Sequence, residues 1–145
     1  MTIMFTFLVV LAVDQFTKYL VVNNFLVGES VPILENIIHF TYVRNQGAAF
    51  GIMQGQQFIF IIATVAILVA IVIFYKELPL HNFMNRFALG LVLGGAIGNL
   101  IDRVRLGYVI DFIDFRIWPV FNIADSSVVI AVTIFSYWLL VIDNN

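Results

Sequence analysis

The chain of 145 residues has no cysteine, only three prolines and few charges. Without cysteine there is no disulfide, no thiol nucleophile and no cysteine-ligated metal. Charged residues make up 11% of the sequence, whereas soluble domains carry about 25%. The net charge is −2 and no basic cluster is present, which argues against nucleic-acid binding. These absences leave membrane proteins without thiol chemistry as the class to consider.

Hydrophobic residues account for 62% of the chain, which indicates an integral membrane protein. The length allows one compact helical unit, so we expect a single domain over residues 1–145. Apolar runs predict four membrane-spanning helices, at about residues 3–22, 58–75, 87–101 and 120–142. The first run lacks the basic start and small-residue cleavage site of a signal peptide, so we expect it to be retained. Between the first two runs, β-branched and aromatic residues predict short strands at the membrane surface, at about residues 23–44.

The most polar part of this apolar chain runs from Gly94 to Asp125. It holds four of the nine acidic residues and three of the seven basic residues. Ionised groups near hydrocarbon are costly unless they are paired or face water, so they mark functional candidates. Four crossings place this stretch, the end of the first span and the start of the second at one face of the membrane. The loop from Lys76 to Arg86 is expected at the other face. We therefore infer a single polar site built from several helix ends.

Some of these residues also have a purely structural explanation. Asp14 and Lys18 are four residues apart and predict an ion pair within the first helix, whether or not that pair also anchors a polar site. The small residues of NQGAAFG (Asn45 to Gly51) and the pair Gly94 and Gly98 are typical of tight helix packing. Trp118 and Trp138 lie near the two ends of the last span, as interfacial anchors often do.

Aspartates are the residues most suited to chemistry here. His39 and His81 lie outside the central stretch, and no Ser-His or metal-ligand spacing is present. Two aspartates that share a site cannot both ionise easily, so one keeps a proton. Such a pair can take a proton from water and return one to a leaving amine. For Asp102 and Asp114 the neighbouring arginines, Arg103 and Arg116, favour plain salt bridges.

Five segments in order resemble bacterial lipoprotein signal peptidase, also called signal peptidase II, over nearly the whole chain. They are DQFTK (Asp14 to Lys18), RNQGAAFG (Arg44 to Gly51), GGAIGNLIDR (Gly94 to Arg103), GYVIDFIDF (Gly107 to Phe115) and FNIAD (Phe121 to Asp125). The resemblance implies Asp111 and Asp125 as the catalytic pair. It also implies a second set of positions that shape the site or bind substrate: Asp14, Lys18, Asn45, Gly47, Asn99, Asp102, Arg103 and Asn122.

The resemblance implies an all-α fold of four transmembrane helices with a small extracytoplasmic β-rich cradle. The implied activity is removal of the signal peptide from diacylglyceryl-modified prolipoproteins, by an aspartyl endopeptidase that cuts before the lipid-bearing cysteine. No cofactor or metal is implied. The implied partners are the prolipoprotein signal peptide, membrane lipid and globomycin-type inhibitors, and we expect a monomer. The implied location is the bacterial inner (cytoplasmic) membrane, with both termini cytoplasmic and the site extracytoplasmic, although a count of Lys and Arg by loop favours the reverse orientation.

Two other functions fit parts of the pattern. A proton-coupled carrier would also use membrane aspartates, but it needs ionisable residues near the bilayer midplane, and the second span has none. A non-catalytic assembly subunit would use Gly94 and Gly98 for packing. In that case, replacing the aspartates would affect only partner binding.

Overall fold

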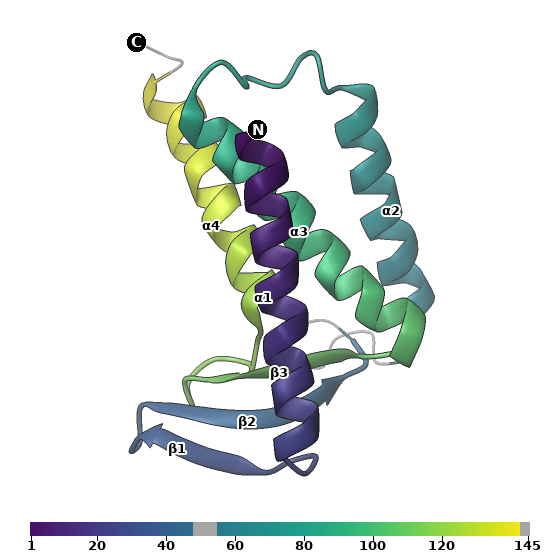
Figure 1. Cartoon of the computed structure of the whole chain (residues 1–145), viewed down its shortest axis with the longest axis vertical. Helices are drawn as coiled ribbons and strands as arrows, with labels where there is room; N and C mark the ends of the chain where they lie inside the picture. The colour runs from purple at the N-terminus through teal and green to yellow at the C-terminus, as the bar shows by residue number, and fades with distance from the viewer. Residues whose placement is uncertain (48–54, 143–145) are drawn as a thin grey trace.

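The computed structural model describes residues 1–47 and 55–142. Helices and strands follow one another in these residues as α1 (Thr2–Asn24), β1 (Ser30–Leu34), β2 (Ile38–Asn45), α2 (Gln57–Ile73), α3 (Phe83–Leu106), β3 (Val109–Asp114), α4 (Ile123–Tyr137) and the short π-helix η2 (Trp138–Ile142). The helices stand over a small sheet, and the N-terminus lies at the end far from it (Figure 1). Of the predicted small-residue segment Asn45 to Gly51, residues 48–51 lie outside the described residues.

Local sequence signals set the ends of α3 and α4. The Asn82 side chain caps α3 by accepting a hydrogen bond from Asn85 N at 2.7 Å. The helix ends at Gly107, whose left-handed φ of 76° lets its N–H return to Arg103 O. Asn122 begins α4 in a capping box with Asp125. The cap of α4 therefore already fixes one aspartate of the predicted catalytic pair.

Among the described residues, three helices are long and apolar enough to cross a membrane: α1, α3 and α4 with its extension to Val141. Helix α2 is apolar but has 17 residues, about 26 Å at 1.5 Å per residue. Helix α3 extends past the predicted 87–101 at both ends. Asp102 therefore lies inside a helix and not beyond its end, because the apolar pattern stops before the helical backbone does.

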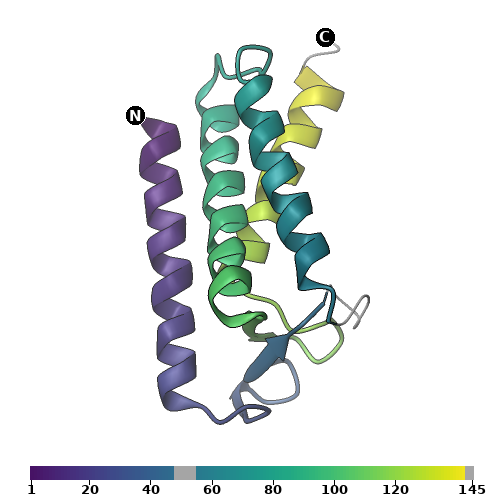
Figure 2. The same cartoon turned by 90° about the vertical axis from the view of Figure 1, so that its right-hand side faces the viewer.

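Small residues let the helices approach closely. Helix α3 packs on α1 and α4, while α2 packs chiefly on α3 and buries none of its side chains. Figure 2 shows α1, α3 and α2 as neighbouring rods, with the sheet beneath them. A Cβ placed on Gly94 would lie 2.7 Å from Val10 Cβ, and one on Gly98 would lie 2.5 Å from Asp14 Oδ2. The predicted packing role of these two glycines is confirmed.

The sheet is larger than predicted, because β3 joins it. The strand order is β1-β2-β3, all antiparallel, and Asn45 of β2 pairs with Val109 of β3. The expected all-α fold with strands confined to residues 23–44 is therefore corrected to a mostly helical fold with a three-stranded sheet. In VIDFID five of six residues are buried, so the polar-apolar alternation that marks a half-exposed strand is missing.

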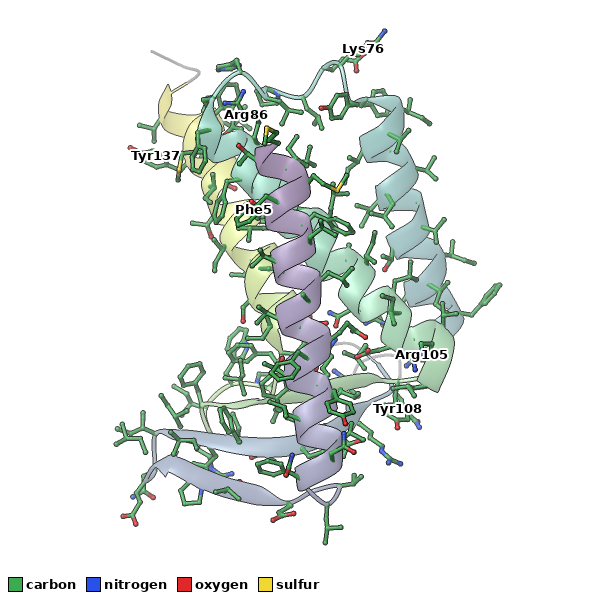
Figure 3. The ribbon with its side chains drawn as sticks, in the orientation of Figure 1. Phe5, Lys76, Arg86, Arg105, Tyr108 and Tyr137 are labelled. Carbon is green, nitrogen blue, oxygen red and sulfur yellow. The ribbon has the colours of Figure 1, made fainter. Side chains whose placement is uncertain are left out.

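Two apolar clusters enclose the polar residues. One joins α1, α3 and α4 through Val10, Ala88, Leu91 and Ala131. The other joins α1 to the sheet through Val21, Tyr42, Ile110 and Phe112. On α1 the buried stripe runs Thr6, Val10, Asp14, Lys18, Val21, so its two charged members lie between the clusters. As predicted, Lys76 and Arg86 lie at the opposite end of the molecule from the sheet (Figure 3).

Candidate active site

Lys18 is the centre of a buried ionic cluster. Its ammonium lies 2.9 Å from Asp14 Oδ2, 2.8 Å from Asp102 Oδ2 and 2.9 Å from Asn99 Oδ1. Because an ammonium has three N–H groups, all three are satisfied. The Lys18 side chain is only 2% exposed, so the two carboxylates are what compensate its charge in this setting. The predicted Asp14–Lys18 pair is confirmed, and Asp102 joins it from α3.

Both carboxylates of this cluster also hold backbone beside the predicted catalytic pair. Asp14 Oδ1 accepts from Ala124 N at 3.0 Å, one residue before Asp125. Asp102 Oδ2 accepts from Ile110 N at 3.2 Å, one residue before Asp111. The start of α4 and the strand β3 are thus both tied to Lys18 through one side chain each.

Asparagine side chains carry the network onward to the two aspartates. Asn122 Nδ2 donates to Asp111 Oδ1 at 2.7 Å, while Asn122 N donates to Asp125 Oδ2 at 3.2 Å. Asn99 Nδ2 donates to Asp125 Oδ1 at 2.7 Å, and Asn45 Nδ2 donates to Asp111 Oδ2 at 2.8 Å. Since Asn99 Oδ1 faces Lys18, its amide can only present N–H to Asp125. Each carboxylate is fixed by two donors.

The environment of Asp111 favours its protonated form. The side chain is 1% exposed, and burial, followed by the negative charge of Asp125, raises the pKa of Asp111 to about 7. The hydrogen bonds from Asn45 and Asn122 and the charge of Lys18 oppose this rise. At neutral pH Asp111 is therefore poised to hold or release a proton, as a general acid or base must be.

Both aspartates border one cavity of about 350 Å³. Its wall combines side chains from the sheet, from α2, α3 and α4 and from the loop before α4: Asn45, Gly47, Phe60, Arg103, Val109, Asp111, Trp118, Pro119, Val120, Phe121, Asp125 and Val129. The Arg103 guanidinium lies over the Phe60 ring at 5.1 Å, and its buried Nε has no hydrogen-bond partner among residues 1–47 and 55–142. A carbonyl oxygen entering the cavity could accept from Arg103.

The structure brings all ten predicted site residues into this region. Eight form the hydrogen-bonded network, Gly47 N donates to Asn45 Oδ1 at 2.9 Å, and Arg103 borders the cavity. Trp118, expected as an interfacial anchor, also borders the cavity. Within residues 1–47 and 55–142, no group of three or more His, Asp or Glu side chains could hold a metal ion.

Of the two salt-bridge predictions, one is confirmed and the other is wrong. Asp114 pairs with Arg116 at 3.2 Å as expected. For Asp102 the expected arginine partner is wrong: it forms its ion pair with Lys18, because the helix turns the Asp102 side chain towards α1. Gln15 was missed, although it donates to Asp14 Oδ2 and Asp102 Oδ1 at 3.2 Å each. An amide inside an apolar helix, next to Asp14, was the signal that could have identified it.

Comparison with known proteins gives a consistent match. Residues 6–141 match the family model described as signal peptidase (SPase) II. The chain is 48% identical to the lipoprotein signal peptidase of Halothermothrix orenii, over 91% of this chain and 90% of that protein. It is also 48% identical to the lipoprotein signal peptidase of Moorella thermoacetica, over 92% and 89% of the two chains.

Solved structures of bacterial membrane enzymes share this fold. One bacterial membrane enzyme, determined by the in meso method at 2.3 Å resolution, superposes with a TM-score of 0.90 at 39% identity, covering 96% of this chain and 87% of that chain. Another, at 1.9 Å resolution, superposes with a TM-score of 0.88 at 39% identity, covering 97% and 94%.

Proposed function

Because this chain belongs to the signal peptidase II family, and is thus a membrane aspartyl protease that removes signal peptides from prolipoproteins, we propose that Asp111 and Asp125 are its catalytic pair. The observation that carries the proposal is the position of Asn122, which donates to both carboxylates from one residue. Both aspartates also border the same cavity. Two carboxylates held this way can share one proton.

The proposed reaction is hydrolysis by an activated water. One carboxylate takes a proton from water as the oxygen attacks the scissile carbonyl, and its protonated partner gives a proton to the leaving amine. Arg103 donates to the carbonyl oxygen as it becomes negative. Asn45, Asn99 and Asn122 keep the two carboxylates oriented. We propose that cleavage falls just before the lipid-modified cysteine of a diacylglyceryl-modified precursor.

Cleavage of a lipid-modified precursor in detergent tests the pair. Asp111→Asn and Asp125→Asn should each lower turnover by at least about 10²–10⁴-fold, the range typical for loss of a general acid or base. Glu35→Gln, the same chemical change at an exposed turn of the sheet, should leave turnover unchanged. Full activity of either catalytic variant, with folding intact, would remove that residue from the pair. A wild-type protein that moves protons in liposomes and cuts nothing would favour the carrier.

We further propose that α2 is a fourth membrane span. It has no charged residue and buries no side chain within the protein, as expected of a helix surrounded by lipid. Its length of about 26 Å is close to the hydrocarbon thickness of about 30 Å. Four spans put both chain termini on one side of the membrane.

The proposed orientation puts both termini in the cytoplasm and the sheet with the site outside, in the bacterial inner membrane. A signal peptide presents its cleavage site outside the cytoplasm, which supports this choice. The cysteine-free sequence offers a direct test. In intact cells, a membrane-impermeant thiol reagent should label Glu35→Cys, at the sheet, and not Lys76→Cys, in the loop between α2 and α3. The reverse labelling pattern would mean that the protein has the opposite orientation in the membrane.

The state of assembly and the mode of inhibition are part of the same proposal. We propose an active monomer, because a single chain supplies both carboxylates and the four hydrogen bonds that hold them; activity that falls steeply on dilution in detergent would contradict it. Globomycin-type inhibitors are proposed to occupy the cavity beside Asp111 and Asp125. Competition between globomycin and the lipid-modified precursor is the expected kinetic pattern.

A further inference from the structure

A row of polar side chains crosses all three strands, away from the Lys18 cluster. Ser30 Oγ of β1 lies 2.8 Å from Thr41 Oγ1 of β2, and Thr41 Oγ1 donates to Asp114 Oδ2 of β3 at 2.7 Å. His39 Nδ1 lies 3.2 Å from Ser30 Oγ. The catalytic proposal uses none of these residues. The row ends on Asp114, which is 5% exposed.

Asp114 holds the chain where it leaves β3. Its Oδ1 accepts from Arg116 N at 2.7 Å, and its Oδ2 accepts from Arg116 Nη1 at 3.2 Å. Arg116 has a φ of 65°, a left-handed conformation that is uncommon for residues other than glycine. Burial works against ionisation of Asp114, but the hydrogen bonds from Thr41 and Arg116 outweigh it and lower its pKa. We call Thr41, Asp114 and Arg116 the clasp.

The clasp lies at the start of a short loop, residues 115–121, and the other end of this loop is hydrogen-bonded to the sheet. Phe121 N donates to Ile113 O at 3.0 Å, and Ile113 N donates to Phe121 O at 2.8 Å. The Phe115 and Phe121 rings stack with centroids 5.6 Å apart. With both ends fixed, the turn at Arg116 sets the direction in which residues 115–121 project.

This loop forms a wall shared by two cavities. One is the 350 Å³ cavity with both catalytic aspartates. The other, of about 440 Å³, is bordered by Phe115, Trp118, Phe121, Asp125, Ser126, Val129 and Ile130. Trp118 and Phe121 face both cavities, beside Asp125. A change in the loop's direction would alter the width of the space beside the catalytic pair.

We propose that Asp114 is a positioning residue for substrate binding: through the clasp it sets the loop that forms the apolar wall beside Asp125. This inference rests on the peptidase function proposed above. It separates Asp114 from Asp111, three residues earlier, which acts in the chemical step. Loss of the clasp should weaken binding of the precursor and spare turnover of the bound complex.

Steady-state cleavage of the lipid-modified precursor tests this division. Asp114→Asn should raise KM by about tenfold, the size expected for one lost charge-assisted hydrogen bond, with kcat within about twofold of wild type. The pH profile of kcat should stay that of wild type. Ser30→Ala, which shortens the row without touching Asp114, should leave KM unchanged.

Substitutions at Arg116 test the turn itself, and its side chain is 51% exposed, so the fold should tolerate them. Arg116→Val disfavours the left-handed conformation and should raise KM as Asp114→Asn does. Arg116→Gly adopts that conformation freely and keeps the backbone hydrogen bond to Asp114 Oδ1 while losing the guanidinium contact, so it should raise KM less than Arg116→Val does. Adding Arg116→Gly to Asp114→Asn should lower the raised KM part of the way back to the wild-type value.

Two kinetic results would overturn the positioning role while the peptidase function stands. One is a fall in kcat with unchanged KM in Asp114→Asn, and the other is wild-type kinetics in both Asp114→Asn and Arg116→Val. If Asp114→Asn does not fold, the KM values of Arg116→Val and Arg116→Gly decide between the same alternatives. A wild-type protein that cleaves no precursor would instead refute the peptidase proposal.

Discussion

Replacing Asp111 with asparagine should destabilise the folded protein at acidic pH and stabilise it at alkaline pH. Asparagine keeps the shape of the side chain but cannot ionise. In the folded protein burial and the charge of Asp125 raise the pKa of Asp111 from 3.8 to about 7. The folded state therefore holds this proton more tightly than the unfolded chain, and wild-type stability falls as pH rises from about 4 to about 7.

The size of the effect follows from that difference. Roughly three pH units at about 1.4 kcal/mol each give about 4 kcal/mol of stability lost by wild type over this range. The Asp111→Asn variant loses none of this stability, because asparagine does not ionise. It has a fixed cost, because Asp111 accepts from Asn45 and from Asn122, and an NH₂ group facing one of those donors costs about 1–3 kcal/mol. The variant should thus be less stable than wild type near pH 4 and more stable near pH 9.

Unfolding of the detergent-solubilised protein by SDS, followed at both pH values, measures the two free energies. The difference between variant and wild type should change by about 4 kcal/mol between the two conditions. Asp114→Asn is the matched control: hydrogen bonds from Thr41 and Arg116 outweigh burial and lower the Asp114 pKa, so its deficit should be constant above about pH 5.

A constant difference for Asp111→Asn across the pH range would refute the reasoning, since Asp111 would then titrate like an exposed carboxyl. Asp125→Asn provides an internal check. It removes the negative charge that is the second cause of the raised pKa, so the pH dependence of wild-type stability should become shallower in this variant and remain in part, because burial persists.

Three further predictions concern the same site. Lys18→Met leaves the carboxylates of Asp14 and Asp102 buried without their cation and should cost about 3–5 kcal/mol in the SDS titration; a loss below about 1 kcal/mol would mean that water replaces the ammonium. Gly98→Ala puts a Cβ 2.5 Å from Asp14 Oδ2, so both the midpoint of unfolding and kcat should fall, and unchanged kcat would show that Asp14 can move without disturbing the pair. In wild type, kcat/KM should decline as pH rises through about 7, because deprotonation of Asp111 leaves the pair without its shared proton; a profile flat to about pH 9 would contradict the assignment.

Several features of this protein followed from local sequence. Apolar runs identified the helices, although the backbone of α3 continues past the apolar pattern to Leu106. The pairs Asp14–Lys18 and Asp114–Arg116 were predicted correctly, because residues four apart on a helix, or two apart in a turn, meet whatever the rest of the chain does. The predicted alternation of four apolar runs placed the polar residues at one end of the molecule.

Other features depended on residues far apart in the chain. Strand β3 is recognisable only once β2 lies beside it, because burial on both faces removes the alternating pattern. Asp102 could have met an arginine one residue away, yet it meets Lys18, 84 positions earlier in the chain, since the crossing of α1 and α3 decides which faces touch. Sequence determined which residues are polar and on which helix end they lie. Only tertiary packing decided which carboxylate is held by which donor, because hydrogen bonds depend on distances of a few ångströms that helix crossings and strand register set.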